Sequence, residues 1–252
     1  MKILAGKGIE HEKRFLEKLR EDGKTVVELN KRDIALTREA LASGAEVIYQ
    51  AWLESADGVF GGYADFLVRS GNSADGAPLY EAWDTKLARS AKPTFILQLC
   101  LYSEMLADMQ GVLPDRLGVV LGTGELKTYP LNRFLHLHRV IERRFLDFQE
   151  AYDPENPPHP ADSSEHGRWS NLAGRILENL DHLCRVANIT RGQIRKLEAA
   201  GITRLGELAE SQTRRVPGIA PQVLSRLKLQ ASLQILSEGK DVPEYRIAPL
   251  DP

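Results

Sequence analysis

Three charged residues in the middle of the chain have types and a spacing that suit metal-dependent chemistry. Asp84 and Lys86 lie two residues apart within Leu79–Leu87, and Asp65 lies in the segment before it. Because side chains alternate along a strand, Asp84 and Lys86 project from one face, and pairing with a neighbouring strand brings Asp65 alongside. Two adjacent carboxylates form an oxygen site of the kind that Mg²⁺ prefers, and a lysine beside it orients or deprotonates water or holds developing negative charge.

The triplet Asp84-Thr85-Lys86 is a weak signal by itself, since a solvated strand face often produces it. The residues around the triplet nevertheless favour a functional role for it. Tyr80, Trp83 and Leu87 surround the triplet and predict a largely buried strand. An aspartate and a lysine that are buried without a role are energetically costly.

The segments around these residues predict a mixed α/β sheet flanked by helices. Three consecutive strands form a meander of hairpins, and Pro93 opens a mostly apolar helix after them. The predicted helices are 9–22, Asp33 (as the cap) to about Ser43, Pro93 onward and 132–150, and the predicted strands are Thr25–Leu29, Val47–Leu53, Gly61–Arg69, Leu79–Leu87, Leu117–Leu121 and Leu126–Leu131.

The last hundred residues differ in character from the first 150. Residues 152–163 are rich in proline and polar residues, which is typical of a linker or an extended segment. Helical patterns follow at 171–187, 190–200, 203–211 and 219–237. We therefore predict a core domain over 1–150, a linking segment over 151–175 and a small all-α domain over 176–252.

Composition limits the classes of function. The 252 residues carry a formal net charge of -2, so any nucleic-acid binding requires a local basic patch. The two cysteines, Cys100 and Cys184, form no CxxC pair and predict neither a zinc site nor a disulfide framework. With no signal-peptide pattern and no apolar run long enough for a bilayer, we expect a cytoplasmic protein without membrane contact.

Two further features lie on the predicted helices. Gly8 and His11 are in the first helix, and Gln98 and Tyr102 share a face of the apolar helix because they are four residues apart. Alone, each is also typical of a surface histidine or of the polar edge of a helix.

Taken in order, these features resemble the RecB-like branch of the PD-(D/E)XK nucleases over about residues 1–150. The matching motifs are Gly8…His11, Gly62…Asp65, Asp84-Thr85-Lys86 and Gln98…Tyr102. The closer resemblance, through GIEHE, GGYADFLVR, YEAWDTKLARSAKP and LQLCLYSEML, is to RecB-family nucleases that are often joined to a superfamily 1 helicase.

This resemblance implies a restriction-endonuclease-like fold and a role for each motif residue. Asp65, Asp84 and the backbone carbonyl of Thr85 would bind Mg²⁺ or Mn²⁺, with His11 as a further ligand. Lys86 would act on the nucleophilic water or the scissile phosphate. Gln98 and Tyr102 would position the substrate backbone or brace the site.

The chain departs from this family at the iron–sulfur cluster that many members carry. The family's three later cysteines fall on Ser164, Gly167 and Ala173, and the cysteine before the core is also missing. Iron–sulfur ligation needs thiolates, so we expect no iron–sulfur cluster.

The C-terminal helices resemble tandem helix–hairpin–helix modules, in which a small glycine-containing hairpin approaches a phosphate closely. Basic residues exceed acidic ones by five between 191 and 228 (eight against three), which suits non-specific DNA binding. The alternative is a helical bundle with a solvated basic face. The candidate nucleic-acid-binding residues are Arg191, Arg195, Lys196, Arg214, Arg215, Gly218, Arg226 and Lys228.

The sequence therefore predicts a metal-dependent nuclease that hydrolyses single- or double-stranded DNA in repair, recombination or processing. The alternative is a catalytically silent nucleic-acid-binding scaffold descended from such a nuclease. No GxxxxGK[ST] motif is present. A helicase partner would therefore lie on a separate chain or in a region outside this sequence.

Overall fold

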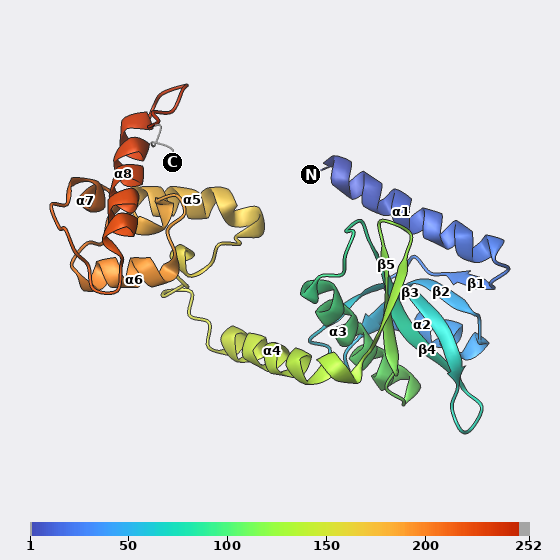
Figure 1. The fold of residues 1–252 in the computed structure, drawn as a ribbon. Helices are drawn as coiled ribbons and strands as arrows, with labels where there is room; N and C mark the ends of the chain where they lie inside the picture. The colour runs from blue at the N-terminus through green and yellow to red at the C-terminus, as the bar shows by residue number, and fades with distance from the viewer. Residues whose placement is uncertain (1, 247–252) are drawn as a thin grey trace. The chain divides into compact units, whose positions relative to one another are not determined.

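The computed structural model describes residues 2–246 of the chain. The chain divides into two compact units, Met1–Ala151 and Tyr152–Pro252 (Figure 1). Of the segment 151–175, predicted as a linker, all but Ala151 therefore belongs to the second unit. No helix within the described residues is both long enough and apolar enough to span a bilayer.

The first unit contains a six-stranded mixed sheet in the order β1-β2-β3-β4-β5-β6. β2, β3 and β4 form the antiparallel meander that the sequence predicts, and β5 pairs with β6 in the same way. β1–β2 and β4–β5 are parallel pairs, each joined by a crossover helix, as parallel strands require. The strands are β1 (Val26–Glu28), β2 (Val47–Glu54), β3 (Gly61–Asn72), β4 (Pro78–Lys86), β5 (Arg116–Leu121) and β6 (Leu126–Pro130).

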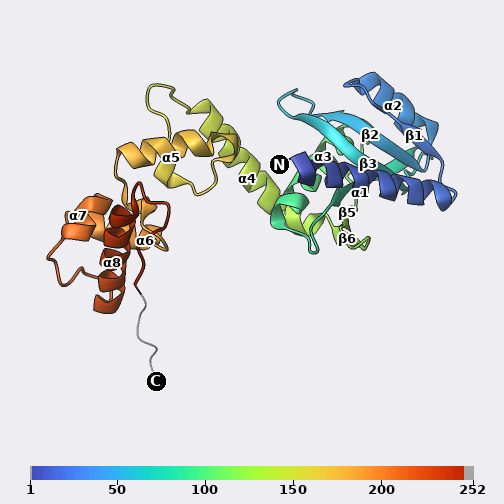
Figure 2. The same cartoon turned by 90° about the horizontal axis from the view of Figure 1, so that it is seen from above.

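Helices pack on the sheet through two separate apolar clusters. Leu16 and Leu19 of α1 (Lys2–Glu21) pack with Phe66 of β3, and α1 runs across the sheet in Figure 2. The crossover helices α2 (Ile34–Ser43) and α3 (Pro93–Gln110) bury Leu41 and Leu99 in the larger cluster. The last helix of this unit is α4 (Asn132–Glu150). The prediction of a mixed sheet flanked by helices is confirmed.

Local capping chemistry sets the bounds of the crossover helices. Asp33 caps α2, because its Oδ1 accepts a hydrogen bond from the amide of Ala35 at 2.9 Å. Pro93 is the first residue of α3, and Gly111 ends that helix at a φ of 73°. The predicted start of the first helix at residue 9 is wrong, because α1 extends back to Lys2.

The second unit is a small helical domain with its own core. Its largest buried side chains include Leu183, Leu197, Leu208 and Leu227. The helices are α5 (Ser170–Asn179), α6 (Arg191–Ala199), α7 (Leu205–Glu210) and α8 (Pro221–Ser237), with short 3₁₀ turns η1 (Pro160–Asp162), η2 (Gly167–Trp169) and η3 (Leu183–Arg185).

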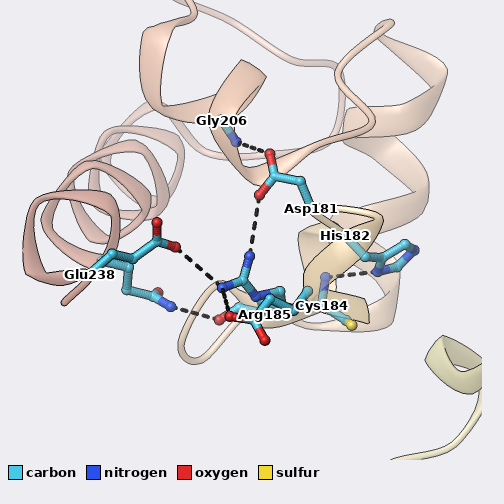
Figure 3. Close-up of polar contacts among 8 residues, drawn as sticks. Asp181, His182, Cys184, Arg185, Gly206 and Glu238 are labelled. Carbon is cyan, nitrogen blue, oxygen red and sulfur yellow. Dashed lines mark hydrogen bonds and ion pairs between the residues drawn. The ribbon is translucent and has the colours of Figure 1, made fainter. Parts of the chain in front are cut away.

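The predicted helix over 171–187 is wrong, because α5 ends at Asn179. Asp181 follows with a φ of 47°, a left-handed conformation that stops a helix. Its carboxylate accepts a hydrogen bond from the amide of Gly206 at 2.8 Å, in the first turn of α7, and also meets Arg185 (Figure 3). Arg185 in turn pairs with Glu238 after α8. These contacts join the segment after α5 to α7 and α8.

Two turns of the second unit share one local geometry. In 186–189 the amide of Ile189 donates to the carbonyl of Val186 at 3.2 Å, and in 216–219 Ile219 donates to Val216 at 3.0 Å. The third residue of each turn has positive φ: 63° at Asn188, and 77° at the second turn's Gly218. A helix follows each turn directly, α6 after the first and α8 after the second.

Candidate active site

The sheet brings the two carboxylates of the predicted site together. β3 and β4 pair with Phe66 opposite Trp83, so Asp65 and Asp84 are level with each other. Asp84 is 2% exposed. Burial, followed by the neighbouring Asp84 carboxylate, raises the pKa of Asp65 well above the ordinary range of an aspartate. Two carboxylates are therefore packed where both cannot easily be charged without a cation.

Lys86 lies on the same face of β4 as Asp84, as the strand alternation predicts. Its Nζ is 2.5 Å from Oδ2 of Asp84 and 5.5 Å from the centre of the Phe95 ring on α3. Within the part of the chain that the structure describes, this Oδ2 atom is buried and has no partner with hydrogen-bond geometry. Among the described residues, the cation close to this oxygen is the Lys86 ammonium group, which is itself partly exposed.

Thr85 orients Asp65. The amide of Thr85 donates to Oδ2 of Asp65 at 3.2 Å, and the Thr85 hydroxyl lies 3.3 Å from the same atom. The resemblance assigns the carbonyl of Thr85 to a metal. The amide and hydroxyl of Thr85 hold the neighbouring carboxylate in place, and the role of its carbonyl stays a prediction.

A glutamine that sequence reasoning did not select completes this part of the site. Gln50 on β2 has a φ of 57°, a conformation that is rare outside glycine. Its amide nitrogen donates to Oε1 of Glu12 and lies 3.5 Å from Oδ1 of Asp65. Tyr49 donates to the same Glu12 oxygen at 2.8 Å.

The positive φ of Gln50 explains how two consecutive strand residues reach one partner. Ile48 and Ala51 belong to the same apolar cluster, although they are three positions apart and would point to opposite faces of a regular strand. The alternation of side chains between the two faces of β2 therefore shifts by one residue at Gln50. As a result, Tyr49 and Gln50 both face Glu12 of α1. No sequence signal marked this shift, because glutamine is not a residue that usually adopts this conformation.

His11 is placed by α1 over the parallel strand β5. It is 7% exposed, and its Nε2 lies 3.4 Å from the carbonyl of Val120, which pairs with Thr85. A donor at Nε2 leaves Nδ1 with a free lone pair, and metal-binding histidines use their second nitrogen in this way. Among the described residues, the ligand atoms of His11, Asp65 and Asp84 are not gathered as one compact cluster.

Gln98 and Tyr102 lie together on α3. The Gln98 amide is 3.2 Å from the Tyr102 hydroxyl. Burial, and then the nearby carboxylates of Asp84 and Asp65, raise the pKa of Tyr102. A Cβ on Gly62 would meet the Tyr102 hydroxyl at 3.0 Å, so the ring packs closely against β3 at this glycine. The hydroxyl therefore belongs to the surroundings of the carboxylate pair.

The residues present fit a hard divalent cation. Asp65 and Asp84 supply oxygen ligands, and Oδ2 of Asp84 is buried with only the Lys86 ammonium close to it among the described residues. A bound cation would compensate both the burial and the mutual repulsion of the carboxylates. The structure thus brings together Asp65, Asp84 and Lys86, with Tyr102 nearby.

The candidate nucleic-acid-binding residues are in the second unit and fall into two groups. Three make internal bonds: Arg191 donates to the carbonyl of Asp162 at 2.6 Å, Lys196 to that of Gly218 at 2.7 Å, and Lys228 to that of Thr213 at 3.3 Å. The other four side chains, Arg195, Arg214, Arg215 and Arg226, are exposed. Gly218 is also exposed.

Comparison with known proteins adds no assignment. No protein-family model matches this chain, and no curated protein matches it.

Proposed function

We propose that this protein is a metal-dependent nuclease that hydrolyses phosphodiester bonds of DNA, with the restriction-endonuclease-like fold of the RecB-like PD-(D/E)XK nucleases. The observation that carries the proposal is the adjacent pair of Asp65, which is partly buried, and Asp84, which is buried, with Nζ of Lys86 2.5 Å from Oδ2 of Asp84. A buried carboxylate pair is unfavourable unless a cation or a proton compensates it.

Each residue of the site has a role in this reaction. Asp65 and Asp84 would hold Mg²⁺ or Mn²⁺, which supplies Lewis-acid activation of the phosphate and of water. Lys86 lies beside Asp84, at the carboxylate pair, so it suits stabilisation of negative charge on the phosphate. Gln98 and Tyr102 offer donors for the substrate backbone. His11 is a further ligand through Nδ1.

Gln50 and Thr85 act through Asp65 and are positioning residues. Thr85 donates to one carboxylate oxygen of Asp65, and Gln50 lies beside the other. Both oxygens are therefore directed before any cation binds, and such outer contacts commonly govern metal affinity.

We assign the second unit to DNA binding as a tandem helix–hairpin–helix domain. The turns 186–189 and 216–219 share their hydrogen bond and their left-handed third residue, and each opens a helix. Exposed backbone at Gly218 and the exposed Arg214 and Arg215 nearby suit contacts with phosphates, which position DNA without reading its sequence.

The deciding experiment is a cleavage panel of labelled single- and double-stranded DNA and RNA with Mg²⁺, Mn²⁺ or a chelator. We expect metal-dependent cleavage of DNA that Asp84→Asn removes. Binding of DNA without cleavage of any substrate would instead favour the silent scaffold. All four motifs of the resemblance are intact in this sequence, which favours the enzyme over the silent scaffold.

A further inference from the structure

A second group of metal-ligand side chains lies between α3 and α4. Glu104 comes from α3, and His138 and Glu142 come from successive turns of α4. One ligand atom from each lies within 4.8 Å of the others. Glu104 is two residues from Tyr102, about 200° around the helix, so it projects away from the carboxylate pair of the sheet.

The histidine of this cluster is buried, and among the described residues its Nε2 makes no hydrogen bond of normal geometry. His138 is 6% exposed. Its Nε2 lies 3.0 Å from Oε2 of Glu104 and 3.9 Å from Oε2 of Glu142. Within the described residues, neither Nε2 of His138 nor Oε2 of Glu104 has a partner with hydrogen-bond geometry. Buried polar atoms rarely lack a hydrogen-bond partner, and a bound ion is one explanation for such an exception.

We propose that Glu104, His138 and Glu142 bind a divalent transition-metal ion, with Zn²⁺ as the best fit. Zn²⁺ binds imidazole nitrogen and carboxylate oxygen at about 2.0–2.1 Å, which places tetrahedral ligand atoms about 3.3 Å apart. The separations of 3.0 and 3.9 Å lie on either side of that value. The imidazole distinguishes this site from the all-oxygen sites that suit Mg²⁺.

Arg139 holds one of the ligands in place. Its Nε donates to Oε1 of Glu104 at 2.7 Å, which leaves Oε2 directed toward His138. An outer contact of this kind orients a ligating carboxylate. Two carboxylates and one guanidinium leave a net negative charge for the ion.

A groove lies beside the Glu104 and Glu142 side of the cluster. Beside the cluster is a cavity of about 470 Å³ lined by Glu104, Arg139, Glu142, Arg143, Leu146 and Asp147. Three protein ligands and an open side admit a water molecule or an anion as the fourth ligand. Because the ligands come from both helices, the ion would fasten α4 to α3.

The test is a Zn²⁺ titration of the chelator-treated full chain, by calorimetry and by the visible spectrum with Co²⁺. It is done in an Asp84→Asn background, so that the carboxylate pair of the sheet does not contribute. We expect one equivalent of Zn²⁺ and the absorption of four-coordinate Co²⁺. His138→Gln should remove both signals, and Glu142→Gln should weaken binding by about tenfold or more.

The matched control is His136→Gln, since His136 is exposed on the same helix and should retain full binding. If His138→Gln does not fold, Glu142→Gln decides the question, because that side chain is 27% exposed. Absence of Zn²⁺ binding, or binding that both ligand variants leave unchanged, overturns the proposal and leaves His138 and Glu104 as an ion pair. Neither outcome bears on DNA cleavage.

Discussion

At the scale of single residues, the site depends on a strained glutamine as much as on its charged groups. A left-handed backbone at a non-glycine residue is unfavourable by roughly 1–2 kcal/mol. At Gln50 that strain accompanies contacts with Glu12 and Asp65. Strain of this kind persists where surrounding structure enforces it, and it clusters at functional sites.

Gln50→Gly and Gln50→Ala separate the strain from the contacts. Both remove the amide, so both should raise the Mg²⁺ concentration for half-maximal cleavage by about tenfold. Only glycine adopts this backbone conformation without strain. The glycine variant should therefore be about 1 kcal/mol more stable than the alanine variant, and its thermal midpoint should be higher. Cleavage assays at several Mg²⁺ concentrations and thermal unfolding test this. An unchanged Mg²⁺ requirement in both would reduce Gln50 to a structural role.

Asp84→Asn tests the carboxylate pair directly. Loss of a metal ligand should reduce cleavage by at least about a thousandfold, whereas loss of one of two repelling charges should leave the metal-free fold as stable as before. Mg²⁺ should raise the thermal midpoint of the wild type and not that of the variant. The control is Asp22→Asn, at an exposed position just after α1. Wild-type turnover by Asp84→Asn would rule out the assignment.

At the scale of elements, close backbone contacts fix where the strands end beside the site. A Cβ on Gly122, just after β5, would stand 2.3 Å from the carbonyl oxygen of Leu87, just after β4. The Gly122 amide also donates to the carbonyl of Ala88 at 3.0 Å. The end of β4, which carries Lys86, is therefore packed against the backbone of a glycine at the end of β5.

Gly122→Ala should force these segments apart. The clash is with backbone, so we expect a loss of about 2 kcal/mol or more in stability and a lower cleavage rate through displacement of Lys86. Chemical denaturation and the cleavage assay measure the two effects. Gly71→Ala, where nothing lies within 4 Å of the added atom, is the matched control and should be nearly neutral. Equal stability of the two variants would contradict this packing.

At the scale of the whole molecule, the proposed chemistry and the proposed DNA contacts belong to different compact units. The carboxylate pair is in the sheet of the first unit, and the exposed arginines near Gly218 are in the second. With a formal net charge of -2, the chain has no general attraction to nucleic acid, so binding depends on where its basic residues lie.

The double variant Arg214→Ala/Arg215→Ala should weaken DNA binding without changing the rate on saturating substrate. Losing two phosphate contacts should reduce the slope of log affinity against log salt by roughly 1.5. Binding measured at several salt concentrations gives this slope. Lys31→Ala/Arg38→Ala, with the same change in charge on exposed residues of the first unit, controls for net charge. Coincident slopes for the wild type and the Arg214/Arg215 variant would remove these arginines from the DNA-binding surface.

The sequence predicted the first unit's elements well, because each depends on local chemistry. Asp33 and Pro93 start helices through a cap and a fixed φ, and the alternation of β4 places Lys86 beside Asp84. The prediction from the sequence failed at 171–187, where apolar periodicity continues past the end of α5. There Asp181 makes contacts with α7 and Arg185 that no local pattern reveals.

For the candidate site, the sequence by itself determined the charged residues and their order along the strands, since side-chain alternation is a property of any strand. Only the tertiary structure decided that Gln50 shifts the alternation of β2, and that α3 and α4 bring Glu104 to His138. The physical reason is the separation along the chain over which each effect acts. Propensity and periodicity act over a few residues, whereas these contacts join segments whose meeting depends on how helices pack.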